Sequence, residues 1–359
     1  MKNKIRVTKT FLPPQDEYQS ILSRAWDKNW ITNRGVLVEE LENSLKTFLE
    51  VSNLIATTNG TLPLQIAIKA LNLTGEIITT PFSYVATTSS IVWQGCTPVF
   101  VDIDPEYFTI DETKIEAAIT KNTSAILATH VYGNPCNVLE IERIAKKHQL
   151  KVIYDAAHSF GVRYKGKSIF NFGDVSTCSF HATKIFHTGE GGAIFCKNKY
   201  YDDMFNYHNF GHNGEEEFHG LGINAKMSEP QAAMGLAMLP YLQLIFKERE
   251  VLTNLYNSKL KNSRIELLKI REGTDWNHSY YPVIFKTESQ LLKVRLELEK
   301  RNIYPRRYFF PSLNKLPYLT YKSCPVSEKI SALVLCLPLY PGLEESEANI
   351  ITDIINANV

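Results

Sequence analysis

Short apolar runs rich in Val and Ile alternate with segments of helical periodicity over residues 76–157. The runs EIITTP, PVFVDI, SAILATHVYG and KVIYDAA each have the length and composition of a buried strand. Helices are expected between them, for example over 138–148, and an amphipathic helix over 36–49 precedes them. Strands that alternate with helices are joined by crossovers, which make neighbouring strands parallel. The chain is therefore predicted to be an α/β protein with a mostly parallel sheet that is buried on both faces.

Two functional groups stand where predicted strands end. Asp155 closes the run KVIYD, and Lys184 follows a second strand-like run over 175–180. Ligands of open α/β sheets bind at the carboxyl edge of the strands, so an acid and an amine from neighbouring strands can face one small molecule. A single aspartate at a strand end is often a helix cap, and a single lysine is usually a solvated surface group. The pair, framed by Ser179 before the lysine and GEGG after it, favours a functional site.

One cofactor requires such a pair of groups. Pyridoxal phosphate is bound through a lysine Schiff base, and a carboxylate beside its pyridine nitrogen keeps the ring protonated and electron-accepting. The segments YDAAHS, SFHATK and GEGG resemble the sugar aminotransferases of the DegT/DnrJ/EryC1/StrS family. The similarity extends over nearly the whole chain.

The resemblance implies the fold of that family, which is fold type I of the pyridoxal-phosphate-dependent transferases. In this fold a large domain, with a mostly parallel seven-stranded sheet flanked by helices, precedes a smaller α/β domain. We place the N-terminal arm and the large domain in residues 1–240, and the linking helix and the small C-terminal domain in residues 241–359. Ser228 is expected to cap a long helix at this junction, and Pro240 to bend it.

The resemblance also implies roles around the cofactor ring. Lys184 would carry the cofactor, Asp155 would contact the ring nitrogen, and His158 would lie near the phenolic oxygen or the ring face. An aromatic residue precedes VAT in the family pattern, so we assign the stacking role to Tyr84 rather than to Phe82. From the residues alone, an aromatic side chain at this place can equally fill the core.

Four further residues match the family's phosphate contacts. The turn at Gly60 and Thr61 opens a predicted helix, whose first amides lack internal partners and can bind a phosphate. Without the resemblance, this turn fits an ordinary strand-to-helix connection at least as well. Ser179 matches a serine that contacts the phosphate. Asn224 matches an asparagine that reaches the cofactor phosphate of the partner subunit, which implies a homodimer with active sites at the interface.

Residues on the substrate side are His181, Lys226, Arg306 and Tyr308. Strand alternation would place His181 on the same face as Ser179. Lys226 stands where many family members have arginine, so a carboxylate-binding role carried over from that arginine loses its bidentate geometry. The segment RRYFFP over 306–311 could bind a nucleotide diphosphate and stack on its base, or form an ordinary patch at the rim.

The resemblance implies a transaminase that moves an amino group from glutamate to a nucleotide-linked keto sugar, in the biosynthesis of O-antigen or glycoside deoxyamino sugars. The segments are most similar to enzymes that aminate C4 of dTDP-4-keto-6-deoxy-D-glucose. Amination at C3, or a UDP- or GDP-linked sugar, is the alternative within the family. Relatives that use the cofactor for deoxygenation have histidine in place of the lysine, against which Lys184 argues. A non-catalytic pyridoxal-phosphate-binding regulator is the alternative from another class.

Composition excludes several other classes. The 39 Lys and Arg residues nearly balance the 38 Asp and Glu residues, so no charge footprint for nucleic acid or an anionic membrane is present. The six cysteines lack CxxC spacing, which argues against a zinc site and a disulfide framework. No apolar stretch has the length of a signal peptide core or a membrane span, so a cytoplasmic enzyme without a metal is expected.

Overall fold

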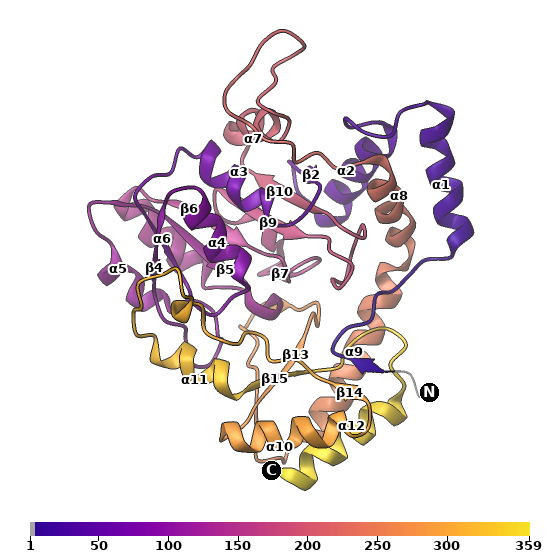
Figure 1. Ribbon diagram of the computed structural model, residues 1–359, viewed down its shortest axis with the longest axis vertical. Helices are drawn as coiled ribbons and strands as arrows, with labels where there is room; N and C mark the ends of the chain where they lie inside the picture. The colour runs from indigo at the N-terminus through magenta and orange to yellow at the C-terminus, as the bar shows by residue number, and fades with distance from the viewer. Residues whose placement is uncertain (1–3) are drawn as a thin grey trace.

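The computed structural model describes residues 4–359, and a seven-stranded sheet forms the core of the upper part of the molecule in Figure 1. Its strands are β2 (Ile55–Thr57), β3 (Glu76–Thr79), β4 (Thr97–Phe100), β5 (Thr123–Thr129), β6 (Lys151–Asp155), β9 (Val175–Ser179) and β10 (Gly192–Cys196). The spatial order is β2-β10-β9-β6-β5-β3-β4. The pairs formed by β10 with β2 and β9 are antiparallel and the other four pairs of this sheet are parallel, so the predicted mostly parallel seven-stranded sheet is confirmed.

Apolar side chains cover this sheet on both faces, as the sequence predicted. Along β6, Val152 and Tyr154 belong to one buried cluster, whereas Ile153 between them belongs to the other. The first cluster packs against α1 (Gln15–Asp27), α2 (Val36–Leu49), α5 (Ile115–Ala118), α6 (Val138–His148) and α8 (Glu229–Met238). The second packs against α3 (Leu62–Ala70), α4 (Val85–Trp93) and α7 (Tyr201–Tyr207). The alternation of side chains along each strand explains why the strands are apolar throughout.

Helix α6 shows how local sequence sets the boundaries of these elements. The Asn137 side chain accepts a hydrogen bond from the Glu140 N–H and caps the first turn. Buried residues recur at helical spacing from Val138 to Ala145, and basic residues stand in the last turn, where they complement the helix dipole. The helix occupies residues 138–148, which is the predicted range.

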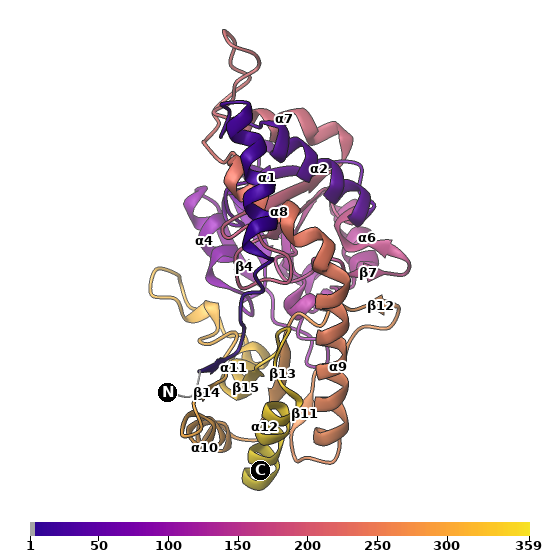
Figure 2. The same cartoon turned by 90° about the vertical axis from the view of Figure 1, so that its right-hand side faces the viewer.

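The C-terminal part of the chain builds a second layer of helices and strands (Figure 2). Its strands β11 (Glu266–Leu267), β13 (Tyr281–Ile284) and β15 (Val334–Leu337) form an antiparallel sheet. Its helices are α9 (Leu242–Leu260), α10 (Glu288–Glu299), α11 (Pro325–Leu333) and α12 (Glu345–Asn358). Residues of α9, α10, α12, β13 and β15 share one buried apolar cluster, separate from the two clusters of the large sheet. This part is therefore the small α/β unit that the sequence predicted.

Short strands from segments that are far apart in the sequence pair at two places. Strand β1 (Ile5–Arg6) pairs with β14 (Ile303–Tyr304), so the first described residues lie against the C-terminal part rather than against the large sheet. The remaining short strands, β7 (Arg163–Tyr164), β8 (Lys167–Ser168) and β12 (Thr274–Asp275), form a three-stranded sheet. Because β12 belongs to the C-terminal part, this sheet ties that part to the large one.

The junction between the two parts lies at the end of α8. Ser228 and Gln231 form a capping box at the start of α8, as predicted for Ser228. The 3₁₀ turn Leu239–Tyr241 contains Pro240 and separates α8 from α9, which agrees with the predicted bend. A domain boundary at residue 240 stays a prediction.

Within residues 4–359, no helix combines the length and the apolar composition needed to cross a bilayer. The same residues contain no group of three or more His, Cys, Asp and Glu side chains arranged to hold a metal ion.

Candidate active site

A cavity of about 260 Å³ lies at the carboxyl ends of β6 and β9. These two strands are parallel neighbours, with Asp155 paired to Thr177, so the loops that follow them leave the same edge of the sheet. We call this the reaction cavity. It is lined by Asn59, Gly60, Thr61, Leu64, Tyr84, Ala86, Asp155, Ala157, His158, Ser179, His181, Thr183, Lys184, Glu190, Tyr280, Arg306, Tyr308 and Phe309. The sequence-based expectation that Asp155 and Lys184 face one space is met.

Asp155 is buried and has no cationic hydrogen-bond partner within the described residues. Its Oδ2 accepts a hydrogen bond of 2.6 Å from the Thr87 hydroxyl, and its Oδ1 accepts one of 3.2 Å from the Ala157 N–H. Burial raises the pKa of the Asp155 carboxyl, while Thr87, Ala157 and Lys184 act to lower it. A positively charged group in the reaction cavity would therefore stabilise the carboxylate.

Lys184 follows β9 in a loop that is fixed by backbone hydrogen bonds. Its N–H donates to the His181 carbonyl at 2.8 Å, and the Ala182 N–H donates to the Gly189 carbonyl at 2.7 Å. Burial lowers the pKa of the Lys184 amine, although nearby groups including Asp155 act to raise it. A lowered pKa increases the share of neutral amine, which is the nucleophilic form.

His158 is buried at the wall of the reaction cavity and is held on two sides. Its Nδ1 accepts a hydrogen bond of 3.2 Å from the Tyr132 N–H, so the neutral ring carries its proton on Nε2. Burial is the main cause that lowers the pKa of His158 well below its usual value. The Asn277 amide donates to the carbonyls of His158 and Phe160, at 2.8 and 2.9 Å. The imidazole is thus a fixed, neutral hydrogen-bond donor.

The predicted phosphate turn lies in the reaction cavity together with Ser179. A Cβ at Gly60 would lie 2.6 Å from the Ser179 Cβ, so only glycine allows these two segments to approach so closely. The Thr61 and Leu62 N–H groups donate to the Asn59 Oδ1 at 2.9 and 3.0 Å. The start of α3 therefore offers fewer free amides than the sequence suggested, because Asn59 uses two of them.

The structure separates the two aromatic candidates for ring stacking. Tyr84 lines the reaction cavity and its side chain is 54% exposed. Phe82 is fully buried and packs edge-on against Phe108, Tyr132 and Phe309. Phe82 fills the core, and Tyr84 is available to a ligand.

His181, Arg306 and Tyr308 also line the reaction cavity. Strand β9 ends at Ser179, so His181 belongs to the loop rather than to the strand; its Nδ1 lies 2.8 Å from the Thr183 hydroxyl. The Arg306 guanidinium lies 4.3 Å from the centre of the Tyr308 ring. Arg307 does not join them, because it pairs with Glu288 and donates to the Ala332 carbonyl.

Asn224 and Lys226 lie outside the reaction cavity of their own chain. Asn224 is exposed and forms an isolated bridge with Asn209. The Lys226 Nζ donates to the Asn209 Oδ1 at 2.8 Å and lies 4.6 Å from the centre of the Phe210 ring. Neither residue lines the reaction cavity of its own chain, and their predicted ligand contacts stay predictions.

Sequence reasoning missed Thr87 and Tyr280. Thr87 donates to Asp155 and also lies 2.7 Å from the Ser83 hydroxyl, within the first turn of α4. The Tyr280 ring lies 5.9 Å from the Lys184 Nζ. The position of Thr87, three residues after Tyr84 at the start of a helix, could have placed it at the same edge of the sheet; nothing in the local sequence marks Tyr280.

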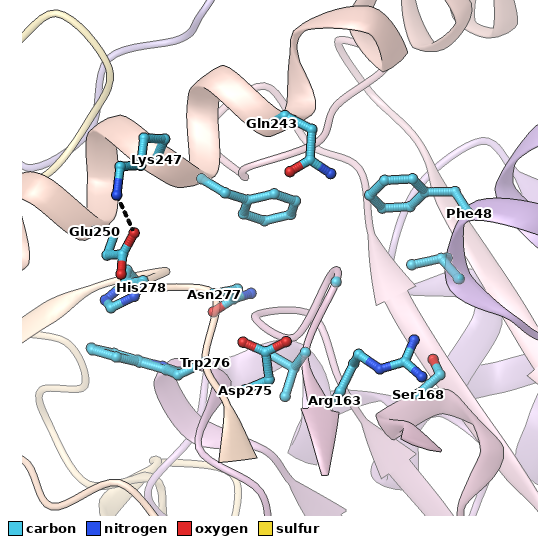
Figure 3. A pocket seen from close by; sticks show the side chains of 14 residues that line it. Phe48, Arg163, Ser168, Gln243, Lys247, Glu250, Asp275, Trp276, Asn277 and His278 are labelled. Atoms are coloured by element: carbon cyan, nitrogen blue, oxygen red, sulfur yellow. Dashed lines mark hydrogen bonds and ion pairs between the residues drawn. The ribbon is translucent and has the colours of Figure 1, made fainter. Parts of the chain in front are cut away.

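A second cavity, of about 410 Å³, lies beside α9 and is drawn in Figure 3. We call it the α9 cavity. Its lining includes Phe48 of α2, Arg163 of β7, Lys247 of α9, Asp275 of β12 and Trp276, which follows β12. None of the residues proposed from the sequence lies there.

The chain matches the model of the DegT/DnrJ/EryC1/StrS aminotransferase family over residues 14–356. It belongs to this family. A relative from Shigella dysenteriae, named dTDP-4-amino-4,6-dideoxy-D-glucose transaminase, is 40% identical over 351 residues that cover 96% of each protein. A GDP-perosamine synthase from Escherichia coli O157:H7 is 32% identical over 92% of each protein.

Solved structures of sugar aminotransferases share the fold of this family member. The crystal structure of DesI in the presence of its TDP-sugar product has a TM-score of 0.94 and 30% sequence identity, covering 99% of this chain and 93% of that one. Family membership implies pyridoxal phosphate as cofactor. The predicted fold of the family is thereby confirmed.

Proposed function

We propose that this protein is a pyridoxal-phosphate-dependent transaminase that moves an amino group from glutamate to C4 of dTDP-4-keto-6-deoxy-D-glucose. The observation that carries the proposal is the reaction cavity, which is lined both by Asp155 at the end of β6 and by Lys184 in the loop after the neighbouring strand β9.

The residues of the reaction cavity fit this cofactor. Lys184 would hold it covalently, and Asp155 would accept a hydrogen bond from the protonated ring nitrogen, which relieves the cost of its own burial. Gly60, Thr61 and Ser179 would hold the phosphate. When bound, the cofactor supplies the electron-accepting ring for the carbanion.

The remaining side chains would orient the ring and move the proton. Tyr84 would stack on the ring, and the His158 Nε2–H would donate to its phenolic oxygen. Burial lowers the pKa of the Lys184 amine, so once the donor has displaced it this amine would serve as the base that takes a proton from the substrate carbon. His181 would contact the substrate.

The choice of nucleotide rests on the relatives. The relative at 40% identity carries the dTDP-sugar in its name, and the crystal structure of DesI was analysed in the presence of its TDP-sugar product. The GDP-perosamine synthase at 32% identity favours a GDP-linked keto sugar as the second candidate.

Two experiments test this proposal. Purified protein should be yellow, and the absorption band of the bound cofactor should disappear when glutamate is added; an unchanged spectrum contradicts this donor or the transaminase reaction. A panel of dTDP-, UDP- and GDP-linked keto sugars, followed by NMR of the product, then identifies the nucleotide and the carbon. Formation of a 4-amino dTDP-sugar is expected, whereas amination at C3 or only of another nucleotide sugar would refute the assignment.

We also propose a homodimer in which Asn224 reaches the partner's cofactor phosphate. This is supported by the exposed apolar side chains Trp93, Phe218 and Leu221, and by the position of Asn224 outside its own cavity. The cytoplasmic location stays a prediction from the sequence.

Hybrid dimers test the contribution of Asn224. One subunit carries Lys184→Ala and the other carries Asn224→Ala. If Asn224 acts on the partner's site, one of the two sites in each hybrid is intact, and mixing the two inactive or weakened proteins should raise the activity. If Asn224 acts within its own subunit, mixing the two variants should not raise the activity.

A further inference from the structure

The Gln231 side chain, in the first turn of α8, joins three segments that are far apart in the sequence. Its Nε2 donates to the Thr58 carbonyl at 3.1 Å and to the Glu190 carbonyl at 2.9 Å. Its Oε1 accepts hydrogen bonds from the Ser228 N–H at 2.9 Å and from the Ser228 hydroxyl at 3.0 Å. A primary amide has two N–H donors and two acceptor sites, so all four are used. We call this amide with its two carbonyl partners the Gln231 clasp.

The orientation of the Gln231 amide follows from its partners. If its nitrogen and oxygen were exchanged, the oxygen would face two carbonyl oxygens, and the NH2 group would face the Ser228 N–H. Both contacts are repulsive. The amide therefore has one orientation, and holding both carbonyls requires a side chain with N–H donors at this position.

The two carbonyls belong to segments that would hold opposite ends of the cofactor. Thr58 stands directly before the turn over 59–61, which would bind the phosphate. Glu190 belongs to the loop that carries Lys184, which would bind the aldehyde end. Gln231 itself does not line the reaction cavity, so it can act on the cofactor only through these two segments.

The ladder of the large sheet ends before it reaches these two carbonyls. Strand β2 pairs with β10 as far as Thr57 and Gly192. Beyond this pair the chain leaves the sheet, and the Gln231 amide takes the carbonyls of Thr58 and Glu190. The Glu190 carbonyl also accepts a hydrogen bond of 2.6 Å from a hydroxyl of its own loop. The Gln231 clasp thus extends the connection between two strands into the loops at the edge of the sheet.

The first turn of α8 is a rigid base for the Gln231 clasp. The buried Glu229 carboxylate accepts hydrogen bonds from the Leu37 N–H at 2.7 Å and from the Val38 N–H at 3.2 Å, at the start of α2. The Thr58 N–H donates to the Ala225 carbonyl, at 2.8 Å, in the segment before α8. Because the base is held in this way, the amide sets the positions of its two carbonyl partners.

A rigid cofactor makes the separation of the two segments important. The pyridine ring of pyridoxal phosphate fixes the distance between its phosphate and its aldehyde carbon. Both ends are therefore held at full strength only if the two protein segments have the matching separation. We propose that Gln231 is a positioning residue that sets this separation. The inference rests on the proposed function, because it requires that the turn over 59–61 and Lys184 hold the two ends.

The variant Gln231→Glu separates this role from the capping of α8. Its carboxylate keeps an acceptor for Ser228 and is favoured in the first turn of a helix, so the cap is retained. It has no N–H group and repels both carbonyls, so the clasp is lost. Gln243→Glu, the same substitution at an exposed position of α9, is the matched control.

Titration of the full-length, cofactor-free protein with three ligands, followed by absorption or fluorescence, tests the proposal. Pyridoxal phosphate engages both ends of the site, pyridoxal lacks the phosphate, and pyridoxamine phosphate cannot form the covalent link to Lys184. Gln231→Glu should weaken binding of pyridoxal phosphate at least about tenfold, and should change the affinity for each of the other two ligands less than about twofold. Gln243→Glu should bind all three ligands as the wild type does.

Two results would overturn the positioning role. One is an unaltered affinity of Gln231→Glu for pyridoxal phosphate. The other is an equal loss of affinity for all three ligands, because general damage to the site would then explain the result. A wild-type protein that gives no absorption band with pyridoxal phosphate would instead refute the proposed function. A wild-type protein with this band, and with the same affinity as Gln231→Glu, refutes only the positioning role.

Should Gln231→Glu fail to fold, Gln231→Met keeps the test valid, because methionine has a similar length and brings no charge next to the carbonyls. Ser228→Ala is then the comparison, since it weakens the cap of α8 and keeps both Nε2 hydrogen bonds. Gln231→Met should bind pyridoxal phosphate about tenfold more weakly than Ser228→Ala does. Equal affinities of these two variants would overturn the proposal.

Discussion

The reaction cavity and the α9 cavity differ more in the pairing of their charges than in their composition. In the α9 cavity, Arg163 pairs with Glu50 at 2.7 Å and Lys247 pairs with Glu250 at 3.1 Å, the second of which is drawn in Figure 3. In the reaction cavity, neither Lys184 nor Asp155 forms an ion pair with any described residue. The larger of the two spaces therefore contains cations that are already neutralised.

The difference in charge pairing identifies the reaction cavity as the candidate site and the α9 cavity as a surface depression. Burial of an ionisable group without a partner costs free energy and shifts its pKa, as at Asp155 and Lys184. Buried ionisable groups without a partner in the protein are common at ligand-binding sites, where the ligand supplies the partner. Such groups therefore indicate a functional site better than the volume of a cavity does. Paired surface charges such as Lys247 and Glu250 contribute little to stability and require no ligand.

The largest expected effect separates the two lysines. Lys184→Ala should lower turnover by a factor on the order of 10⁴ or more, since it removes both the cofactor link and the base. Lys247→Ala, in the α9 cavity, should leave turnover within about twofold. Steady-state assays on both variants check this, and a Lys184→Ala enzyme with full activity would remove the basis of the comparison.

The two aspartates should differ next. Asp155→Asn removes the charge beside the ring nitrogen and should lower kcat by roughly 10²–10³-fold. Asp275→Asn, in the α9 cavity, should leave kcat unaltered. The spectrum of the bound cofactor should also shift in Asp155→Asn and not in Asp275→Asn. Comparable losses of kcat in the two variants would mean that Asp155 has no special role in the reaction.

Asn277 connects the two cavities, because it lines the α9 cavity and its amide donates to the backbone around His158. It therefore tests whether the two cavities are independent. Asn277→Ala leaves two buried carbonyls unsatisfied and should destabilise the protein by about 2–4 kcal/mol. It should also lower kcat about tenfold through displacement of His158. Asn262→Ala, at an exposed position, is the control. Chemical denaturation and kinetics measure both effects, and an Asn277→Ala variant with unaltered stability and kcat would show that the two cavities are independent.

The smallest effect is the pH dependence of stability at His158. In the folded protein the pKa of His158 is held well below its usual value, mainly by burial, whereas the unfolded chain takes up the proton below about pH 6.5. Stability from this group is therefore complete above about pH 6.5 and falls as the pH decreases. Between pH 6.5 and 5.0 the wild type should lose about 2 kcal/mol more than His158→Asn. Urea unfolding at both pH values tests this, and equal losses would contradict a neutral buried imidazole.

The sheet and its carboxyl edge could be predicted from the sequence, because the apolar runs end at or shortly before the candidate site residues. Parallel strands share one carboxyl edge, so Asp155 after β6 and Lys184 after β9 follow from local patterns alone. The helix 138–148 follows in the same way from a cap, a periodic face and basic residues at its end.

The rest depends on contacts between distant segments. Thr87 meets Asp155 across 68 positions of sequence, and Asn277 meets His158 across 119. A buried amide or hydroxyl has no periodic pattern that would reveal such a partner. Arg306 and Arg307 are adjacent and chemically equal, yet one faces the cavity and the other pairs with Glu288. The backbone direction that decides between them is set by β15.

The covalent role of Lys184 can be measured directly. The protein is loaded with pyridoxal phosphate, reduced with borohydride, digested, and analysed by mass spectrometry. The mass of the reduced cofactor should appear on the peptide that contains Lys184 and be absent from it in protein incubated with glutamate before reduction. Labelling of another lysine, or of none, would contradict the account.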